Sequence, residues 1–506
     1  MIDLLSVTQG QTVLPVVLPL LAAFLLQPLG RVAKPLALLL GPATLAVSAY
    51  LLIQLWISFG DTPYMLAIGG YAPPLGIVFY VDQLALLFAT AVPILVLLFW
   101  SRGEDDPDPI RRDAVMLLLA AAGTGLALSG DLFNIYVFYE LTAVASFGLV
   151  TLRATGAAYI ATVRYLLLSA FGSVLALVGI AIIYLETGTL NLAQIAQLAP
   201  TALAGPNGLA AFALLLIGFG VKAELFPVNT WVPEVYATAP TRISALLASL
   251  VSKLAVLVVV RLLVLAFDGT GAAQLMLLLG ALAFVTAELA AWRARDLRRM
   301  LAYSSIGQLG LVFIGFSLSG TAGLLAGLAL ALHHLVIKAA LFGLATRWGG
   351  SLERLVGAAR SAPIASGLMV LFALSLIGVP PLPGFWAKLL VVMGLAEQST
   401  TLSLSALALI LIGTAVEANY LFRLVIKLYA RGEADAPAPP RPKLLDLGIA
   451  SAAGVLLLVA TVGVGRVSGW LGGIASQAAD REVYIRTVFP PKSAAVAAGS
   501  PVHEAS

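Results

Sequence analysis

Long apolar segments alternate with short polar connections along most of this chain. A helix needs about 20 largely apolar residues to cross the hydrocarbon core of a bilayer, and about fourteen segments meet that description. They lie near residues 13–29, 35–58, 79–99, 112–129, 131–151, 163–185, 208–227, 242–267, 272–292, 300–318, 321–346, 363–395, 401–429 and 446–470. The pattern therefore predicts an all-α integral membrane protein with about fourteen transmembrane helices.

Basic residues occupy every second connection of this predicted topology. The even-numbered connections between the spans contain no Lys or Arg. By the positive-inside rule the odd-numbered connections face the cytoplasm, which predicts both termini on the outer side of the inner (cytoplasmic) membrane. The basic residues of the odd-numbered connections are Arg31, Lys34, Arg102, Arg111, Arg112, Arg153, Arg242, Arg293, Arg295, Arg298, Arg299, Arg347, Arg354, Arg360, Lys427, Arg431, Arg441 and Lys443.

The chain ends and one acidic connection need separate interpretations. No basic region or convincing cleavage site accompanies the first span, so we expect a retained helix rather than a signal peptide. Residues 1–470 are predicted to form one transmembrane domain, and the Ala-, Ser- and Pro-rich residues 471–506 a disordered polar tail. The acidic segment GEDDPDP (103–109) is interpreted as a solvated connector; the alternative is a cation-binding loop.

Composition supports the membrane assignment and excludes several kinds of site. Hydrophobic residues make up 60% of the chain and charged residues 11%, whereas a soluble domain carries roughly 25% charged residues. The absence of Cys excludes disulfides, cysteine-ligated clusters and thiolate zinc sites. Three scattered His predict no metal site, and the chain has no nucleotide fingerprint, flavin site or hydrolytic triad. We therefore expect no catalytic centre, cofactor or nucleic-acid partner.

Two predicted spans contain proline in the middle of an apolar run. The segments are LFPVNTWVP (225–233) and GVPPLPGF (378–385), with Lys222 before the first and Lys388 after the second. Proline removes a backbone hydrogen bond, and a broken helix persists in a bilayer only inside protein or beside a wet cavity. The alternative interpretation is two helix kinks with no role in transport.

Paired broken helices are typical of transporters built from inverted repeats, with sites near the bilayer midplane. The natural halves are the spans of residues 112–267 and those of residues 272–429. The sequence thus predicts two inverted five-helix repeats with broken helices 7 and 12.

Ionisable residues within the spans are costly to bury and are functional candidates by default. In general, burial lowers the pKa of a lysine and a nearby carboxylate raises it again. A pair about 6 Å apart at an effective dielectric near 20 attracts by about 3 kcal/mol, or about two pKa units, and histidine titrates near neutral pH unaided. These residue types predict a water-bridged proton relay of Glu140, Lys222, Lys253, His334, Lys338 and Lys388, with Glu224, His333 and Glu417 as possible accessory groups.

Each candidate also has a structural alternative. The lysines at 222, 253 and 388 could be purely structural, His333 a helix-packing donor, and Glu224 a cap of the broken helix. Other charges in or near the spans are assigned from sequence as follows: Arg261 snorkels or pairs structurally, Glu417 pairs with Arg423 or Lys388, and Glu288 and Arg164 are interfacial or structural anchors near span ends.

Several motifs in a fixed order carry a family resemblance. They are GDLFNIYVFYE (130–140), GFGVKAELFPVNTWVPEVYATAPTRISALLASLVSKLAVLVVVR (218–261), DLRRMLAYSSIGQLGLV (296–312), HHLVIKAALF (333–342) and LSLIGVPPLPGFWAKLL (374–390). Over about residues 70–430 the chain resembles the antiporter-like membrane subunits of respiratory complex I, Mrp-type sodium/proton antiporters and membrane-bound hydrogenases. GTLNLAQIA (188–196) looks most like the D-type branch of the Mrp subunits and its hydrogenase relatives.

The resemblance implies a fourteen-helix unit with two inverted five-helix repeats and broken helices seven and twelve. It also implies residue roles: the helix-five glutamate, Glu140, pairs with the helix-seven lysine, Lys222; Lys253 is the connecting lysine; His334 and Lys338 are central; Lys388 is terminal.

Two departures from the family limit what the resemblance implies. Asn229 and Tyr236 stand where many relatives have histidines, so a proton-entry role of those histidines is not carried over. The chain shows no long lateral amphipathic helix after the last span, which predicts a middle-type subunit.

Three functions remain open at this stage. The first is a proton-translocating subunit of an Mrp-, hydrogenase- or complex I-like assembly, moving protons alone or against Na⁺ or K⁺, with other membrane subunits and the lipid bilayer as partners. The second is a stand-alone cation/proton antiporter. The third is a non-transporting membrane anchor for a redox or inorganic-carbon-hydrating partner.

Overall fold

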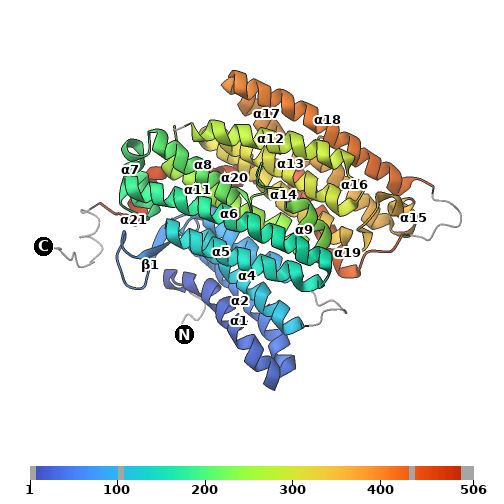
Figure 1. The fold of residues 1–506 in the computed structure, drawn as a ribbon, viewed down its shortest axis with the longest axis horizontal. Helices are drawn as coiled ribbons and strands as arrows, with labels where there is room; N and C mark the ends of the chain where they lie inside the picture. Colours follow the sequence, from blue (N-terminus) through green and yellow to red (C-terminus); the bar gives the residue numbers. More distant parts are fainter. Residues whose placement is uncertain (1–6, 101–107, 270, 432–438, 492–506) are drawn as a thin grey trace.

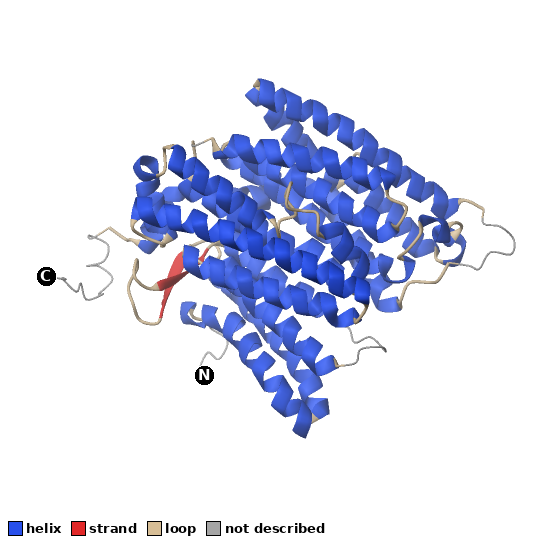
Figure 2. Ribbon diagram, viewed as in Figure 1, coloured by secondary structure: helices blue, strands red, loops and turns tan. Residues whose placement is uncertain are grey.

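A computed structural model describes residues 7–100, 108–269, 271–431 and 439–491 as a bundle of long, roughly side-by-side helices (Figure 1). Two short strands are the exceptions to the helical architecture in the described ranges (Figure 2). Most of the acidic connection, residues 103–107, lies outside the described ranges; Asp108 caps the helix that follows.

Each predicted span contains a helix of the structure. The helices before the midpoint are α1 (Leu14–Val32), α2 (Lys34–Phe59), α3 (Gln83–Leu98), α4 (Pro109–Leu128), α5 (Leu132–Val150), α6 (Gly156–Thr187), α7 (Leu192–Ala202), α8 (Pro206–Gly220), α9 (Val232–Thr238), α10 (Thr241–Leu246) and α11 (Ser252–Ala266). Those after it are α12 (Ala272–Arg293), α13 (Leu297–Ser317), α14 (Gly320–Trp348), α15 (Ala358–Ser361), α16 (Pro363–Ile377), α17 (Pro383–Gln398), α18 (Thr401–Tyr429), α19 (Leu444–Val462), α20 (Val464–Ala479) and α21 (Arg481–Val488).

Within the described ranges, 10 helical segments are long and apolar enough to cross a membrane by themselves. The broken helices supply shorter apolar pieces, α8 and α16, and α3 is also short. The all-α membrane fold is therefore confirmed, while the count of fourteen spans stays a prediction.

Short elements that the apolar pattern did not predict lie in the connections. Strands β1 (Tyr64–Ile68) and β2 (Ile77–Val81) form an antiparallel hairpin in which Tyr64 faces Val81. Helix α7 follows α6 and begins at the cap residue Asn191, whose side chain accepts two backbone N–H groups. Each element is only five to eleven residues long, so a search for 20-residue apolar segments does not detect it.

The prediction of a disordered tail from residue 471 is wrong for residues 471–488, which belong to α20 and α21. Leu471, Ile474, Ala475 and Ala478 are buried and recur at the spacing of one helix face. The Ala-, Ser- and Pro-rich composition of residues 471–506 gives no indication of a buried helix face. Residues 492–506 lie outside the described ranges.

The two halves contain the same backbone bridge at opposite ends of the bundle. Asp131, which caps α5, pairs with Asn191 after α6, and Asp296, which caps α13, pairs with Ser351 after α14. The first bridge adjoins α7 and the second adjoins α15, at opposite ends of Figure 1. This arrangement is that of an inverted repeat; the repeat limits 112–267 and 272–429 stay predictions.

Both proline-containing spans are broken as predicted. Helix α8 ends at Gly220 and α9 resumes at Val232, while α16 ends at Ile377 and α17 resumes at Pro383. Side chains satisfy carbonyls freed at the breaks: Trp231 Nε1 donates to the carbonyl of Val221 at 2.9 Å. Such partners allow irregular backbone to persist at membrane depth.

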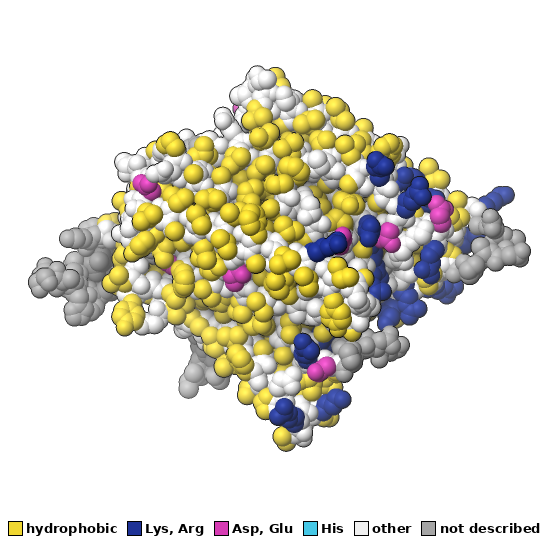
Figure 3. Space-filling view, in the orientation of Figure 1, with side chains coloured by type: hydrophobic (Ala, Val, Ile, Leu, Met, Phe, Trp, Pro, Cys, Tyr) yellow, Lys and Arg dark blue, Asp and Glu magenta, His cyan; other side chains and the backbone are white. Residues whose placement is uncertain are grey.

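Apolar side chains cover most of the broad visible face, whereas Lys and Arg gather at the end that carries α15 (Figure 3). The opposite end carries the β-hairpin, α7 and α21 (Figure 1). A wide apolar face with charge at one end is the surface of a multi-pass membrane protein.

Candidate functional site

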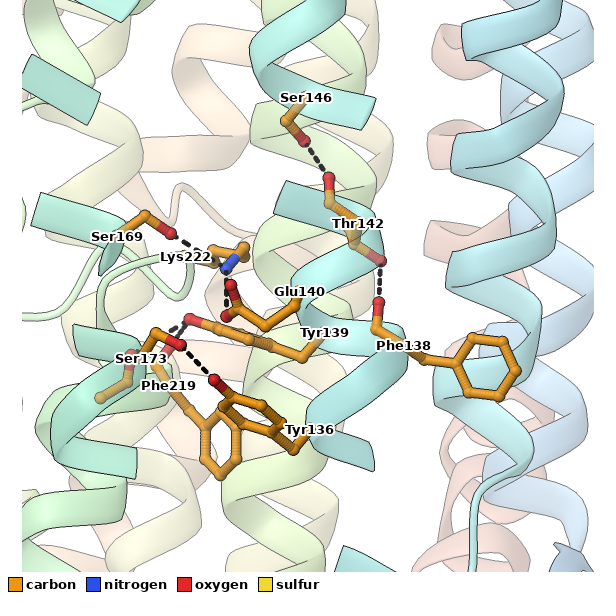
Figure 4. A network of polar contacts seen from close by, with 11 residues as sticks. Tyr136, Phe138, Tyr139, Glu140, Thr142, Ser146, Ser169, Ser173, Phe219 and Lys222 are labelled. Carbon is orange, nitrogen blue, oxygen red and sulfur yellow. Dashed lines mark hydrogen bonds and ion pairs between the residues drawn. The ribbon is translucent and has the colours of Figure 1, made fainter. Parts of the chain in front are cut away.

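The break after α8 places Lys222 against α5 and α6. Its ammonium lies 3.9 Å from Glu140 Oε1, donates to Ser169 Oγ at 3.2 Å, and sits 3.3 Å from the centre of the Tyr139 ring (Figure 4). The Lys222 side chain is 1% exposed and that of Glu140 is 32% exposed. The two predicted partners therefore meet, with the carboxylate on the more open side.

Tyr139 holds this break in place. Its hydroxyl donates to the backbone carbonyls of Gly218 at 3.1 Å and Phe219 at 3.2 Å, at the end of α8 (Figure 4). These carbonyls lie in the last turn of α8, where regular backbone partners begin to be lost; the Phe219 carbonyl also accepts from the backbone N–H of Ala223 at 3.3 Å. One aromatic side chain thus both faces the ammonium and fixes the helix end that carries it.

Glu224 lies inside the same break, at the positive φ of 58°. The hydroxyl of Tyr236 donates to Glu224 Oε1 at 2.5 Å, and Oε2 is buried without a hydrogen bond to any described residue. Lys253 and Lys338 are the basic groups whose charges act on this carboxylate. Glu224 thus faces the centre of the bundle rather than capping a helix end.

Lys253 follows a π-helical turn, η3 (Leu247–Val251), between α10 and α11. Its ammonium donates to the carbonyl of Ala248 and to Ser252 Oγ, the latter at 3.1 Å. A π turn shifts backbone hydrogen bonding by one residue and often marks a functional position. Here the carbonyl inside the turn becomes an acceptor for the fully buried lysine.

Helix α13 supplies hydroxyl partners to the central groups on α14. His334 Nε2 is hydrogen-bonded to Ser305 Oγ at 3.2 Å. Lys338 donates to Ser304 Oγ at 2.8 Å and to the carbonyl of Leu301 at 3.2 Å. Both α14 side chains are fully buried, so the serines replace water as hydrogen-bond partners.

Lys388 forms a close, buried ion pair in the second half. Its ammonium lies 2.6 Å from Glu417 Oε2 and donates to the carbonyl of Ile377, at the end of α16, at 3.3 Å. Gln308 Nε2 donates to Glu417 Oε1 at 2.6 Å. Of the two partners considered for Glu417, the structure therefore selects Lys388.

The remaining charged candidates occupy other environments. His333 Nε2 is hydrogen-bonded to Ser375 Oγ at 2.8 Å, consistent with either packing or relay. Arg261 makes a buried ion pair with Asp82. Arg164 pairs with Glu234 at 2.5 Å at the surface, as expected for an anchor.

Of the two roles expected for Glu288, interfacial or structural anchor, the interfacial one is wrong, because this side chain is 0% exposed. It lies near the polar end of α12, which suggested an interface, but α12 packs against both α13 and α18. That burial depends on contacts between distant segments.

Hydrogen bonds and ion pairs among the described residues do not join the predicted relay residues into one continuous path. Lys222 pairs with Glu140, and Lys388 pairs with Glu417. The central groups each bond to a separate hydroxyl: Glu224 to Tyr236, Lys253 to Ser252, His334 to Ser305 and Lys338 to Ser304. All six predicted relay residues therefore lie inside the bundle or at its edge, but proton passage between the groups requires bridging water. Their relay role stays a prediction.

Sequence reasoning missed the supporting polar residues Ser169, Ser304, Ser305 and Gln308. On α13 a signal was present: YSSIGQLG places polar side chains at spacings of one and four residues inside an apolar span. Residues spaced by four share a helix face. In the parts of the chain that the structure describes, no three His, Cys, Asp or Glu side chains gather to hold a metal ion.

Comparison with known proteins places this geometry in a family. The model described as "NADH:quinone oxidoreductase/Mrp antiporter, TM" matches residues 129–413. NADH-quinone oxidoreductase subunit N of Desulforudis audaxviator is 30% identical over 477 residues, covering 89% of this chain and 94% of the relative. The D-type subunit of the Na⁺/H⁺ antiporter of Bacillus subtilis is 31% identical over 501 residues, covering 94% and 99%.

Comparison with a solved structure supports the same family relationship. The chain is similar to one in the membrane-bound sulfane sulfur reductase, described as an archaeal respiratory membrane complex, with a TM-score of 0.87, 29% identity, and coverage of 94% of this chain and 99% of that one. The similarities extend over nearly the whole fold, including both broken helices. This chain belongs to the NADH:quinone oxidoreductase/Mrp antiporter transmembrane family.

Proposed function

We propose that this chain is a proton-translocating, antiporter-like subunit of a multisubunit membrane complex. The observation that carries the proposal is the series of buried basic groups from Lys222, through Lys253, His334 and Lys338, to Lys388, with the half-buried Glu140 paired to Lys222 at one end. Buried ionisable groups of this kind mark proton and ion pathways in membrane proteins. Membership in a family of antiporter and respiratory-complex subunits supports the same conclusion.

The ion pairs supply a physical means of coupling. At 3.9 Å and an effective dielectric near 20, two unit charges attract by about 4 kcal/mol. Such an energy shifts a two-state equilibrium by up to about a thousandfold. Movement of Glu140 relative to Lys222 therefore controls whether the ammonium is stabilised in place, and the same logic applies to Lys388 and Glu417.

We also propose an orientation, a location and partners. The Lys- and Arg-rich end (Figure 3) would face the cytoplasm by the positive-inside rule, with both termini on the outer side of the inner membrane. Arg481 and Arg486 on α21 lie beyond the last predicted span and do not set the orientation. Other membrane subunits of an Mrp-, hydrogenase- or complex I-like assembly would be partners, as the names of the relatives suggest.

Replacement of Lys222 by Ala and of Glu140 by Ala, separately, tests the proposal. We expect each variant to insert normally and to lose coupled proton movement, measured with a pH-sensitive dye in membrane vesicles that contain the chain with its partners. The matched control is Glu397→Gln, because Glu397 is an exposed carboxylate at the end of α17. Normal transport in both test variants would contradict the proposal.

A further inference from the structure

Glu288 on α12 is a buried carboxylate that the relay described above does not use. It is 0% exposed, and neither carboxylate oxygen has a hydrogen-bond partner among the described residues. An ionised carboxylate buried without donors is among the most costly groups in a protein. The side chain must therefore be neutral or compensated by a cation in its surroundings.

The packing of α12 on α18 places Glu288 opposite Glu417. A Cβ on Gly413 of α18 would lie 2.3 Å from the Phe284 ring, one turn before Glu288. One turn after Glu288, Trp292 Nε1 donates to Asn419 Oδ1 at 3.0 Å. The two helices therefore run side by side in the same direction, and the turn between these contacts brings the carboxylates to the same level.

Helix α13 borders both carboxylates with adjacent residues. A Cβ on Gly307 would lie 2.1 Å from Glu288 Oε1, so the carboxylate rests directly against this glycine and a larger residue there would displace it. The next residue, Gln308, donates to Glu417 Oε1 at 2.6 Å. The side-chain amide of Gln308 on α13 therefore donates to Glu417, whereas Glu288 lies against the backbone of α13 at Gly307.

No cation among the described residues forms an ion pair with Glu288 itself. Glu417, Lys388 and Lys338 act on it, and Tyr420 lies beside it. Lys388 is already held by Glu417 at 2.6 Å, and Lys338 donates to Ser304. With a second carboxylate so near, the arrangement resembles an acid pair in which one member keeps its proton.

We propose that Glu288 carries a proton in the resting protein and serves as an additional proton-holding station between Lys338 and the Lys388–Glu417 pair. In one step the Glu288 O–H bond breaks and its proton passes, through water, to a neutral Lys338 amine, which leaves a carboxylate and an ammonium. In the other step Glu288 accepts a proton from the Lys388 ammonium. Tyr420, which lies beside both Glu288 and Ser304, is placed to orient the connecting water. This inference rests on the proposed function.

Infrared difference spectroscopy of the purified full chain tests the protonation state without any transport. We expect a carboxylic-acid C=O band that shifts on transfer to D₂O and disappears in Glu288→Gln. The exposed-carboxylate variant Glu397→Gln should keep the band. Absence of a band that depends on Glu288 would overturn the inference and would favour an ionised carboxylate compensated by a cation.

Transport in vesicles tests the station itself. Gln has the shape of a neutral Glu but releases no proton, so we expect Glu288→Gln to insert normally and to lower proton movement at least about tenfold, the effect of about 1.4 kcal/mol on a barrier. Glu288→Asp should retain part of the rate. A purely structural role predicts the reverse order, with Gln tolerated.

The outcomes separate this inference from the proposed function. Loss of transport in Lys222→Ala together with normal transport in Glu288→Gln would overturn only the role of Glu288. Normal transport in all of these variants would overturn the proposed function as well. Gly307→Ala gives independent evidence: the added methyl group displaces the carboxylate, and an unchanged infrared band with normal transport would contradict the placement of Glu288 against Gly307.

Discussion

Removing the ammonium of Lys388 exposes the energetic cost of the buried ion pair. In Lys388→Met, Glu417 keeps the hydrogen bond from Gln308 and loses the cation 2.6 Å away. Glu417 is 0% exposed, so no solvent replaces that cation. Removing one partner of a buried pair costs about 3–5 kcal/mol.

The protein can escape part of this cost by protonating Glu417. Protonating a glutamate of ordinary pKa, about 4.3, at pH 7 costs about 3.7 kcal/mol, which sets an upper limit on the penalty. We therefore expect Lys388→Met to lower the free energy of unfolding by about 3–4 kcal/mol at pH 7. Below about pH 5 the loss should shrink, because the unfolded glutamate then also binds a proton.

A double variant separates the pair from the packing of its side chains. In Lys388→Met with Glu417→Gln both charges are gone, and we expect most of the lost stability to return. The assay is reversible unfolding of the purified full chain in mixed detergent micelles, with the two single variants completing the cycle. Strictly additive losses would refute the reasoning, because they would mean that the two side chains do not interact in the folded protein.

Two further predictions concern helix packing and the C-terminal segment. A Cβ on Gly218 would lie 2.6 Å from the carbonyl oxygen of Gly172, so Gly218→Ala should lower the free energy of unfolding by about 1–3 kcal/mol. Gly367 is the control, because a Cβ there meets nothing within 4 Å. Gly367→Ala should be neutral or slightly stabilising in the same unfolding assay. The Tyr484 ring stacks on Tyr80 with centroids 3.7 Å apart. Tyr484→Ala should therefore lose about 0.5–1.5 kcal/mol of stability in addition to the loss from the buried apolar area, and it should make α21 more susceptible to limited proteolysis. An unchanged cleavage pattern would count against the packing of α21 on the bundle.

The broken helices and the buried lysines could be predicted because each depends on local sequence. Proline at 227 and at 380 interrupts a run long enough to cross a bilayer, and Lys222 and Lys388 stand inside apolar runs where a charge is conspicuous. Sequence alone also left two partners open for Glu417, because choosing Lys388 requires the contact between α17 and α18.

Other features depend on packing that no local pattern encodes. The π turn before Lys253 lies inside an ordinary apolar run, and its sequence gives no signal of the extra residue. Glu288 is expected from sequence to be an interfacial or structural anchor because it lies toward a span end, yet α12 packs against both α13 and α18 and the side chain is buried. The helices at the C-terminal end bury one face against distant segments, so composition suggested disorder where tertiary contacts supply order.

The central claim is that buried amines and acids on both halves act as one proton path, joined at Lys338. Lys338→Ala removes the ammonium whose charge interacts with Glu224 in one half and with Glu417 in the other. Measured with a pH-sensitive dye in vesicles that contain normal amounts of the inserted chain and its partners, proton movement should fall at least about tenfold. Proton movement at the unaltered rate in this variant would contradict the account.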